Sequence, residues 1–118
     1  MKARYEIHES KNGEMRFQLK DLKGMVILSS AVYTSRANCG KGIESCREHS
    51  PFDRFYSRSE TGEHSFSLRS SNNRIIGHGG KQATANTRDA MISAVKKYAP
   101  TAQIVNYSEE GEQECKAT

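Results

Sequence analysis

The chain has 118 residues, a hydrophobic content of 35% and no tryptophan; four phenylalanines and five tyrosines are its only aromatic side chains. Its longest uninterrupted apolar stretch is residues 25–28, far short of the roughly 20 residues that span a bilayer, so the sequence excludes a helical membrane protein. The formal net charge of +4 is compatible with a polyanionic partner, although solubility alone also accounts for it.

The same sequence pattern occurs twice, at a spacing of 49 residues. The shift superimposes identical residues without a gap: Gly13 and Gly62, Phe17 and Phe66, Ile43 and Ile92, Pro51 and Pro100. A unit of about 50 residues lies near the lower limit at which a hydrophobic core is self-sufficient, so the two copies should share one core. We therefore predict a single domain over residues 1–107, made of repeat 1 (residues 1–51) and repeat 2 (residues 52–107).

The first copy begins with three predicted strands. Residues 4–8 and 15–20 alternate polar and apolar side chains, which is the period of a half-buried strand. Asn12-Gly13 between them is a strong hairpin signal, because both residues tolerate a positive φ. After a turn, the apolar and β-branched side chains of residues 25–30 predict the third strand.

A helix is predicted from Ser35 to His49. Cys39, Ile43 and Cys46 recur at spacings of four and three, which places them on one helical face. The Ser35 hydroxyl is suited to cap the first turn, and a Ser-Pro pair follows the last turn and ends the helix.

Four small residues of this helix need an explanation. Gly40 and Gly42 each cost about 1 kcal/mol relative to alanine, so we expect close packing against the sheet to compensate. Cys39 and Cys46 would lie about 10 Å apart, beyond the limit of about 7 Å for a disulfide. The chain has three cysteines, and an odd number fits a reducing compartment. We expect buried thiols and a cytosolic protein.

The second copy repeats this order with altered detail. Its later strands are expected at residues 64–69, 74–77 and 103–107. A helix that begins near Thr84 should bury Met91, Val95 and Tyr98. Residues 52–58 should act both as the closing strand of the first copy and as the leading strand of the second, and so tie the copies into one sheet.

These elements predict an α+β fold in which two tandem repeats form one antiparallel sheet with both helices on one face. The inward-facing positions would be Met15, Phe17, Leu19, His64, Phe66 and Leu68. The outward-facing positions would be Arg16, Gln18, Lys20, Ser65, Ser67 and Arg69. The last part of the chain, residues 108–118, carries four glutamates against one lysine, a charge of −3 that leaves +7 on the rest. We expect it to be a disordered acidic tail. A basic body with such a tail indicates either a polyanionic partner or a tail that shields the body.

Four motifs of the first copy occur in order: Asn12-Gly13, Phe17-Gln18-Leu19-Lys20, Tyr33-Thr34-Ser35 and Gly42-Ile43-Glu44-Ser45. With these motifs the chain, up to Tyr107, resembles the YegP-like family of small bacterial proteins. The resemblance implies a β3-α-β unit, doubled in this chain, with the last strand exchanged between the units. It implies no activity, because the family has none assigned. The second copy departs from the pattern, since Gln82-Ala83-Thr84 replaces Tyr-Thr-Ser.

Few residues suggest a functional site. Tyr33, Thr34 and Ser35 precede the first helix, where unpaired N–H groups attract anions; the alternative is an apolar lead-in followed by an N-cap. Glu44 could act as a general base, but it has no histidine partner at a helical spacing. The alternative interpretation is a solvated residue on the helix surface. The four histidines are scattered, and the glycines after His78 lack the lysine and hydroxyl of a phosphate loop.

Three outward-facing cations, Arg16, Lys20 and Arg69, are suited to contact phosphates without reading bases. Sheet-surface RNA binders also need exposed aromatic side chains, whereas Phe17 and Phe66 are predicted to face inward. The sequence therefore predicts at most weak, salt-sensitive nucleic-acid binding.

The sequence favours a small, monomeric, cytosolic, non-enzymatic protein with a structural or partner-binding role, whose partner would be another protein. A weak, nonspecific nucleic-acid or polyanion binder is the alternative. No catalytic residue, metal ligand or cofactor is predicted. The candidate binding residues are Arg16, Lys20, Tyr33, Thr34, Ser35, Glu44 and Arg69.

Overall fold

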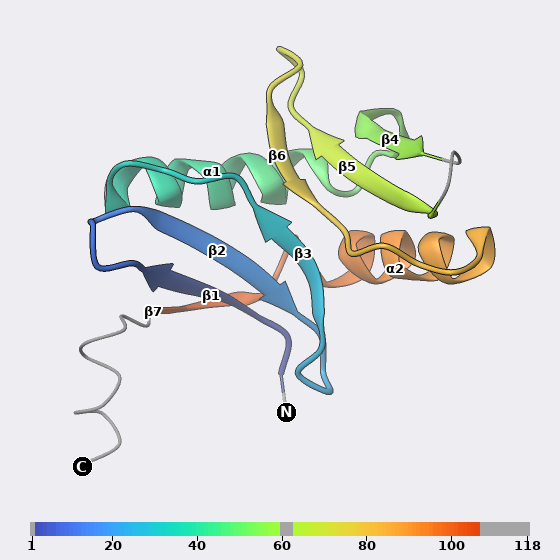
Figure 1. Ribbon diagram of the computed structural model, residues 1–118, viewed down its shortest axis with the longest axis horizontal. Helices are drawn as coiled ribbons and strands as arrows, with labels where there is room; N and C mark the ends of the chain where they lie inside the picture. Colours follow the sequence, from blue (N-terminus) through green and yellow to red (C-terminus); the bar gives the residue numbers. More distant parts are fainter. Residues whose placement is uncertain (1, 60–62, 107–118) are drawn as a thin grey trace.

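The computed structural model describes residues 2–59 and 63–106, which form two consecutive β-β-β-α units and a last strand (Figure 1). The first unit contains β1 (Arg4–Glu9), β2 (Met15–Lys20), β3 (Val26–Ser30) and α1 (Arg36–His49). The second contains a short 3-10 helix (Asp53–Phe55), β4 (Tyr56–Ser59), β5 (Ser65–Arg69), β6 (Ile75–His78), α2 (Ala85–Tyr98) and β7 (Gln103–Asn106). The predicted acidic tail, residues 108–118, and Tyr107 lie outside the described residues.

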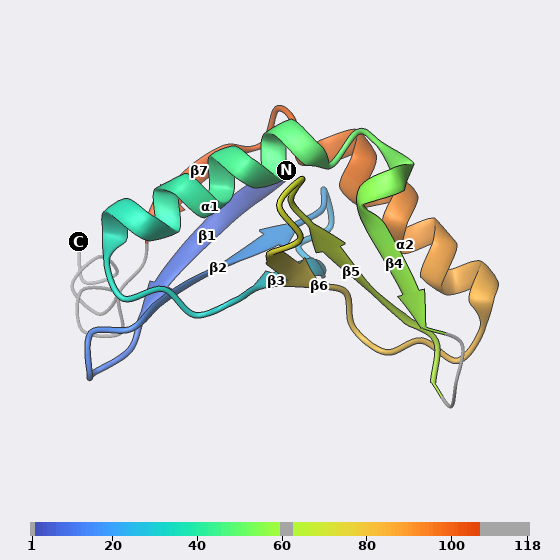
Figure 2. The same cartoon turned by 90° about the horizontal axis from the view of Figure 1, so that it is seen from above.

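The described strands form one seven-stranded sheet in the order β4-β5-β6-β3-β2-β1-β7. Neighbouring strands are antiparallel except β1 and β7, which run parallel with Arg4 beside Gln103. Both helices cover the same face of the sheet (Figure 2). The predicted α+β class, the layer order and the exchange of the last strand into the first copy are therefore confirmed. Neither of these two helices is long and apolar enough to cross a membrane.

The two copies meet where β3 pairs with β6. Ser29 lies opposite His78, and 78 − 49 = 29, so the two residues hold equivalent positions in their copies and a local two-fold axis passes between them. A Cβ on Gly77 would lie 2.7 Å from the Ser29 carbonyl oxygen. Only glycine allows the backbones to approach this closely.

The join between the copies differs from the expectation for residues 52–58. Only Tyr56–Ser59 of this segment is a strand; it pairs with β5 and forms one edge of the sheet. Residues Asp53–Phe55 are a 3-10 turn, since the chain must turn from the end of α1 toward that edge within a few residues. The segment therefore follows α1 and leads the second copy, but the β3–β6 pair makes the sheet continuous.

The core contains the inward positions that the alternation predicts. Met15, Phe17, Leu19, Phe66 and Leu68 are buried, and His64 is partly buried. α1 buries its predicted stripe of Cys39, Ile43 and Cys46. The predicted stripe of α2 needs correction: Val95 is buried, but Ile92 and Arg88 complete the buried face, while Met91 and Tyr98 are only partly buried at its margin.

Both helices begin at the predicted caps and end on buried tyrosine hydroxyls. The Ser35 and Thr84 hydroxyls accept hydrogen bonds from backbone N–H groups of the first helical turn. At the other end, Tyr5 Oη donates to the Ala99 carbonyl at 2.5 Å, and Tyr56 Oη donates to the Ser50 carbonyl at 2.7 Å. Each tyrosine belongs to one copy and each helix to the other. The two bonds therefore tie the copies together reciprocally.

The two helix cysteines are fully buried, as the sequence predicts. Burial raises the pKa of the Cys46 thiol to about 11, and it also raises the pKa of Cys39. Both side chains are therefore protonated at neutral pH and act as small apolar groups of the core.

Candidate functional site: a groove between the two copies

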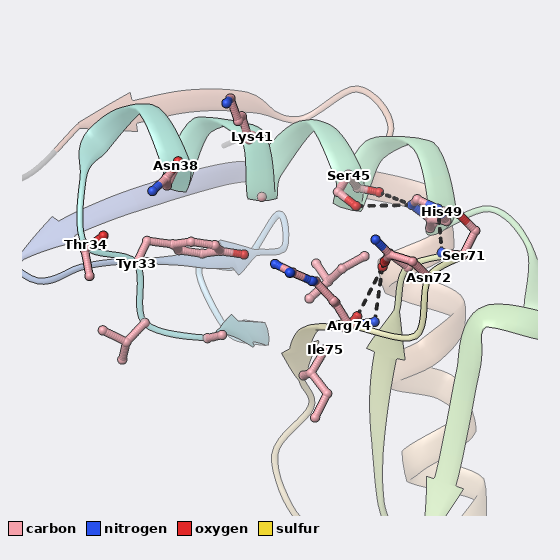
Figure 3. A pocket seen from close by; sticks show the side chains of 15 residues that line it. Tyr33, Thr34, Asn38, Lys41, Ser45, His49, Ser71, Asn72, Arg74 and Ile75 are labelled. Carbon is pink, nitrogen blue, oxygen red and sulfur yellow. Dashed lines mark hydrogen bonds between the residues drawn. The ribbon is translucent and has the colours of Figure 1, made fainter.

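A recess with a volume of about 660 Å³ lies between the two copies. We call it the inter-copy groove (Figure 3). The first copy contributes the loop before α1 and one face of α1, through Ala31, Val32, Tyr33, Thr34, Asn38, Lys41, Gly42, Ser45 and His49. The second copy contributes the β5–β6 turn and the start of β6, through Ser70, Ser71, Asn72, Arg74, Ile75 and Ile76.

Tyr33 lies along the groove beneath α1 (Figure 3). Its backbone N–H and C=O both bond to Met15, at 2.7 and 2.8 Å, and its ring stacks on Phe17 with centroids 6.3 Å apart. A Cβ on Gly42 would overlap the Tyr33 hydroxyl, so close packing compensates for this helical glycine, but the partner is Tyr33 of the loop before α1 and not the predicted sheet. Gly40 faces open space and has no such compensation.

The Tyr33 hydroxyl stays protonated at neutral pH. Burial raises the pKa of this hydroxyl, and the nearby thiols of Cys39 and Cys46 raise it further. The group is therefore a hydrogen-bond donor and acceptor toward the groove, not a base.

A polar stripe of α1 forms one wall of the groove. Asn38, Lys41, Ser45 and His49 follow one another at spacings of three, four and four, which keeps them on one helical face beside the buried stripe. This spacing is readable in the sequence, and our sequence analysis missed it. The opposite wall belongs to the turn of the second copy, which only the fold brings close.

His49 links the two walls at one end of the groove. The backbone N–H of Ser71 donates to His49 Nε2 at 3.1 Å, so this nitrogen carries no proton. The proton is therefore on Nδ1, which donates to the Ser45 carbonyl at 2.7 Å. The ring edge also packs on Phe55, with centroids 4.6 Å apart. Nε2 thus holds the first copy to the second, while Nδ1 is bonded within α1.

The groove combines positive charge with apolar side chains. Lys41 and Arg74 are its two strong cations, and no carboxylate occurs among the described residues that line it. In Figure 3 the Arg74 side chain points into the space between Tyr33 and the β5–β6 turn, whereas Lys41 projects from the side of α1 away from Tyr33. Val32 and Ile75 remain 49% and 39% exposed. Such a lining favours a ligand that carries both carboxylates and apolar groups.

The polar character of the groove is not a property of the repeat. The residues 49 positions after Lys41, Gly42, Ser45 and His49 are Ala90, Met91, Ala94 and Tyr98, and the residue 49 positions before Arg74 is Met25. The symmetry-related positions of the two cations, the hydroxyl and the imidazole therefore carry apolar or aromatic side chains, so the two copies differ at these four positions.

The structure places the sequence-predicted residues in different parts of the molecule. Tyr33 and Thr34 line the groove. The Ser35 hydroxyl is used as the helix cap, accepting from the Asn38 N–H at 3.1 Å. Glu44 is exposed on α1, 3.5 Å from Arg47.

The predicted cations Arg16, Lys20 and Arg69 lie outside the groove, at outward positions of β2 and β5. Lys20 is bound to a carboxylate that our sequence analysis missed. Glu6 is only 3% exposed, although it lies on the sheet face that the helices leave open. Arg4 Nε lies 2.6 Å and Lys20 Nζ 2.8 Å from its carboxylate oxygens.

The environment of Glu6 favours its charged form. Burial alone would raise the pKa of this carboxyl. The hydrogen bonds from Lys20 and Arg4, together with their charges, lower it by more, so the pKa lies below the ordinary value. The alternation of Arg4, Glu6 and His8 on one face of β1 is a signal in the sequence that points to this cluster. Glu6 thereby neutralises part of the surface that was expected to contact phosphates.

Comparison with known proteins agrees with this architecture. The family model described as "Domain of unknown function (DUF1508)" matches twice, over residues 10–56 and 59–106. A UPF0339 protein in the ptx operon 5' region of Stutzerimonas stutzeri is 36% identical over 107 residues, which cover 89% of this chain and 96% of that protein. UPF0339 protein YegP of Escherichia coli (strain K12) is 37% identical over 94 residues, which cover 78% of this chain and 86% of YegP.

Two solved structures have the same fold. The solution NMR structure of YegP from E. coli, titled a protein of unknown function, superimposes with a TM-score of 0.85 at 32% identity and covers 92% of this chain and 96% of that one. A UPF0339 protein from Shewanella oneidensis gives a TM-score of 0.84 at 31% identity and covers 93% of this chain and 95% of that one. The chain therefore belongs to the DUF1508 family and carries two copies of its domain in tandem, as the YegP-like resemblance implies.

Proposed function

We propose that this protein is a non-enzymatic binding protein whose inter-copy groove takes an extended, acidic segment of another polypeptide. One observation carries the proposal: two cations and an apolar rim share a recess with no carboxylate among its described lining residues. Residues of both copies build the recess, so it exists only because the repeat is doubled.

The lining chemistry matches a peptide with alternating acidic and apolar side chains. Lys41 offers a compact ammonium and Arg74 a planar guanidinium, and both pair with carboxylates. Val32 and Ile75 would cover apolar side chains. The amides of Asn38 and Asn72 can both donate to and accept from a peptide backbone.

The reactive side chains of the groove support binding over catalysis. His49 uses one ring nitrogen in a bond within α1 and the other in a bond to the second copy, and the raised pKa of Tyr33 keeps its hydroxyl protonated. The raised pKa of Cys46 keeps its buried thiol from acting as a nucleophile.

We also propose that the protein is cytosolic and monomeric. Two buried thiols, Cys39 and Cys46, support a reducing compartment. The doubled repeat supports a monomer, because one chain supplies both halves of the sheet. Light scattering after gel filtration tests the second point, since a stable dimer would contradict it.

Fluorescence anisotropy tests the binding function. The probe is a fluorescein-labelled dodecapeptide of alternating glutamate and valine, compared with its glutamine counterpart and with a twelve-nucleotide oligothymidine. We expect the glutamate probe to bind best. The double variant Lys41→Glu/Arg74→Glu should weaken its binding about tenfold or more, since one lost charge-assisted contact corresponds to roughly 1.4 kcal/mol or greater.

The control is Lys23→Glu/Lys97→Glu, which changes the net charge equally at two exposed lysines outside the groove. Its affinity for the probe should stay within about twofold of the original, because exposed charges at a distance are screened. An equal loss in the control would contradict a specific groove. Tighter binding of the oligonucleotide than of the peptide would favour the polyanion alternative instead.

A further inference from the structure

We infer that the acidic segment at residues 108–118 of this chain is itself a ligand of the inter-copy groove and competes there with an external acidic ligand. This inference rests on the proposed function, because it assigns a regulator to the same site. It is carried by the point at which the described chain ends, the length of chain that follows, and the distribution of charge.

The described chain ends close to the groove. β7 runs parallel to β1, and its last residue, Asn106, lies beside Ile7. β1 continues to Glu9, which lies opposite Met15, and the Met15 backbone is bonded to Tyr33 in the groove. The end of β7 and the start of α1 lie at the same end of the molecule (Figure 2).

The remaining chain is long enough to reach the groove. Neighbouring strands are about 4.8 Å apart, so the three steps from β7 through β1 and β2 to the Tyr33 segment span roughly 14 Å. The last of the four glutamates, Glu114, lies eight residues after Asn106 and can be about 27 Å from it. This reach exceeds the roughly 14 Å to the Tyr33 segment.

The charge distribution selects the groove among the basic sites near the end of β7. Arg4 and Lys20 are bound to Glu6, Arg36 lies 3.7 Å from Glu9, and Arg16 lines a recess that Glu9 also lines. In the described part of the chain, neither Lys41 nor Arg74 has a carboxylate within ion-pair distance. Residues 108–118 carry a charge of −3, opposite in sign to the groove.

The acidic segment occurs once in the chain and has no counterpart in the other copy. The two family matches end at residues 56 and 106, so residues 108–118 lie outside the repeated unit. The segment contains glutamates between serine, glycine and glutamine, with no large apolar side chain before Cys115. It would satisfy the cations and leave Val32 and Ile75 uncovered, so a ligand with apolar side chains should displace it.

The expected size of the competition follows from tethering. Attachment to the same chain through a short segment supplies an effective concentration on the order of 1 mM. If the segment alone binds the groove with a dissociation constant of about 0.2 mM, an external ligand is weakened about sixfold.

The test uses the full chain and the glutamate–valine probe described above. The tail variant replaces four glutamates by glutamine, at Glu109, Glu110, Glu112 and Glu114. The matched control makes the same change in charge at four exposed glutamates of the body, Glu14, Glu44, Glu48 and Glu63. We expect the tail variant to bind the probe about three- to tenfold more tightly than the original protein, with the control within about twofold of it.

A third comparison separates competition for the groove from a general effect of net charge on the affinity for the probe. In the Lys41→Glu/Arg74→Glu background, the tail substitutions should no longer change the affinity. An equal gain in the tail variant and the control, or no gain in either, would overturn the inference while the groove function stands. If the probe binds none of these proteins, the proposed function fails and the inference falls with it.

Discussion

Two glycines of α1 stand two positions apart and have opposite surroundings. A Cβ on Gly42 would overlap the Tyr33 ring, whereas a Cβ on Gly40 would meet nothing within 4 Å. Gly42→Ala should therefore lower the free energy of unfolding by about 1–3 kcal/mol through overpacking. Gly40→Ala should raise it by about 0.5–1 kcal/mol, because alanine is the better helix former. Urea unfolding measures both changes, and a shift of the same sign in both variants would contradict this reading of the helix.

The carboxylate of Glu6 makes stability depend on pH. Its pKa in the folded protein lies below the ordinary value of 4.5, so in the acid range the unfolded chain binds more protons than the folded one. The stabilisation from Glu6 is therefore present above pH 4.5 and is lost as the pH falls through the lowered pKa. Glu6→Gln should lower the free energy of unfolding at pH 7 by about 1–3 kcal/mol, since it removes hydrogen bonds to charged groups.

The difference between Glu6→Gln and the original protein should shrink steadily below pH 4.5. Urea midpoints at several pH values between neutral and acid measure this difference. Glu44→Gln is the control, because its ion pair with Arg47 is exposed and contributes little. A difference for Glu6→Gln that stays constant across the whole range would contradict the assignment.

At the scale of elements, the ends of the two helices depend on strands of the opposite copy. Ser50 and Ala99 end the helices 49 residues apart and are fully buried, and each carbonyl accepts from one tyrosine hydroxyl. Burial raises the pKa of both Tyr5 and Tyr56, so both hydroxyls remain donors.

Tyr5→Phe and Tyr56→Phe should each lower the free energy of unfolding by about 1–3 kcal/mol, because a buried carbonyl loses its donor. Tyr98→Phe serves as the control and should change it by less than about 0.5 kcal/mol, because Tyr98 is only partly buried. Thermal and urea unfolding measure the three variants. Near-neutral results for both Tyr5→Phe and Tyr56→Phe would show that the helix ends do not tie the copies together.

Local signals predicted most elements correctly because they act within a few residues. The alternation in β1 and β2 and the caps Ser35 and Thr84 are properties of short segments. The α2 stripe was misplaced because Met91 and Ile92 are both apolar and the stripe was started at Met91, although the 49-residue shift aligns Ile92 with Ile43 of the buried α1 stripe. In the structure Ile92 is buried in the core, and Met91 is only partly buried.

The groove was only half predictable for a related reason. Tyr33 and Thr34 were identified from their place before a helix, and the spacing from Asn38 to His49 could have added the polar wall. Arg74 comes from the other copy, and the β3–β6 pairing that places it near Tyr33 depends on contacts nearly 50 residues apart. No local pattern encodes that proximity.

At the scale of the whole molecule, the sheet has a local two-fold axis, but its two ends differ. β7 adds to β1 at one edge, while β4 remains an edge strand at the other, because the segment that follows α1 must itself lead the second copy. The same shift by 49 residues relates Lys41, Ser45, His49 and Arg74 of the groove to Ala90, Ala94, Tyr98 and Met25. The doubled chain has therefore become asymmetric both in its sheet and in its surface chemistry.

Shared packing predicts that neither copy is stable alone. Residues 1–51 would lose β7 from the edge of β1 and the Ala99 acceptor of Tyr5. Residues 52–118 would lose the β3 partner of β6. Each fragment, expressed separately, should show no cooperative unfolding transition by circular dichroism. Two independently folded, non-associating fragments would contradict a common core.

The central claim is that the two copies jointly form one binding site. A titration of the ¹⁵N-labelled full chain with the glutamate–valine dodecapeptide, followed by amide chemical shifts, tests it most directly. We predict that the perturbed amides fall on both walls of the groove, from Tyr33 to Lys41 in the first copy and from Ser70 to Arg74 in the second. Perturbations confined to the open sheet face around Arg4, Arg16 and Lys20, or to one copy only, would contradict it.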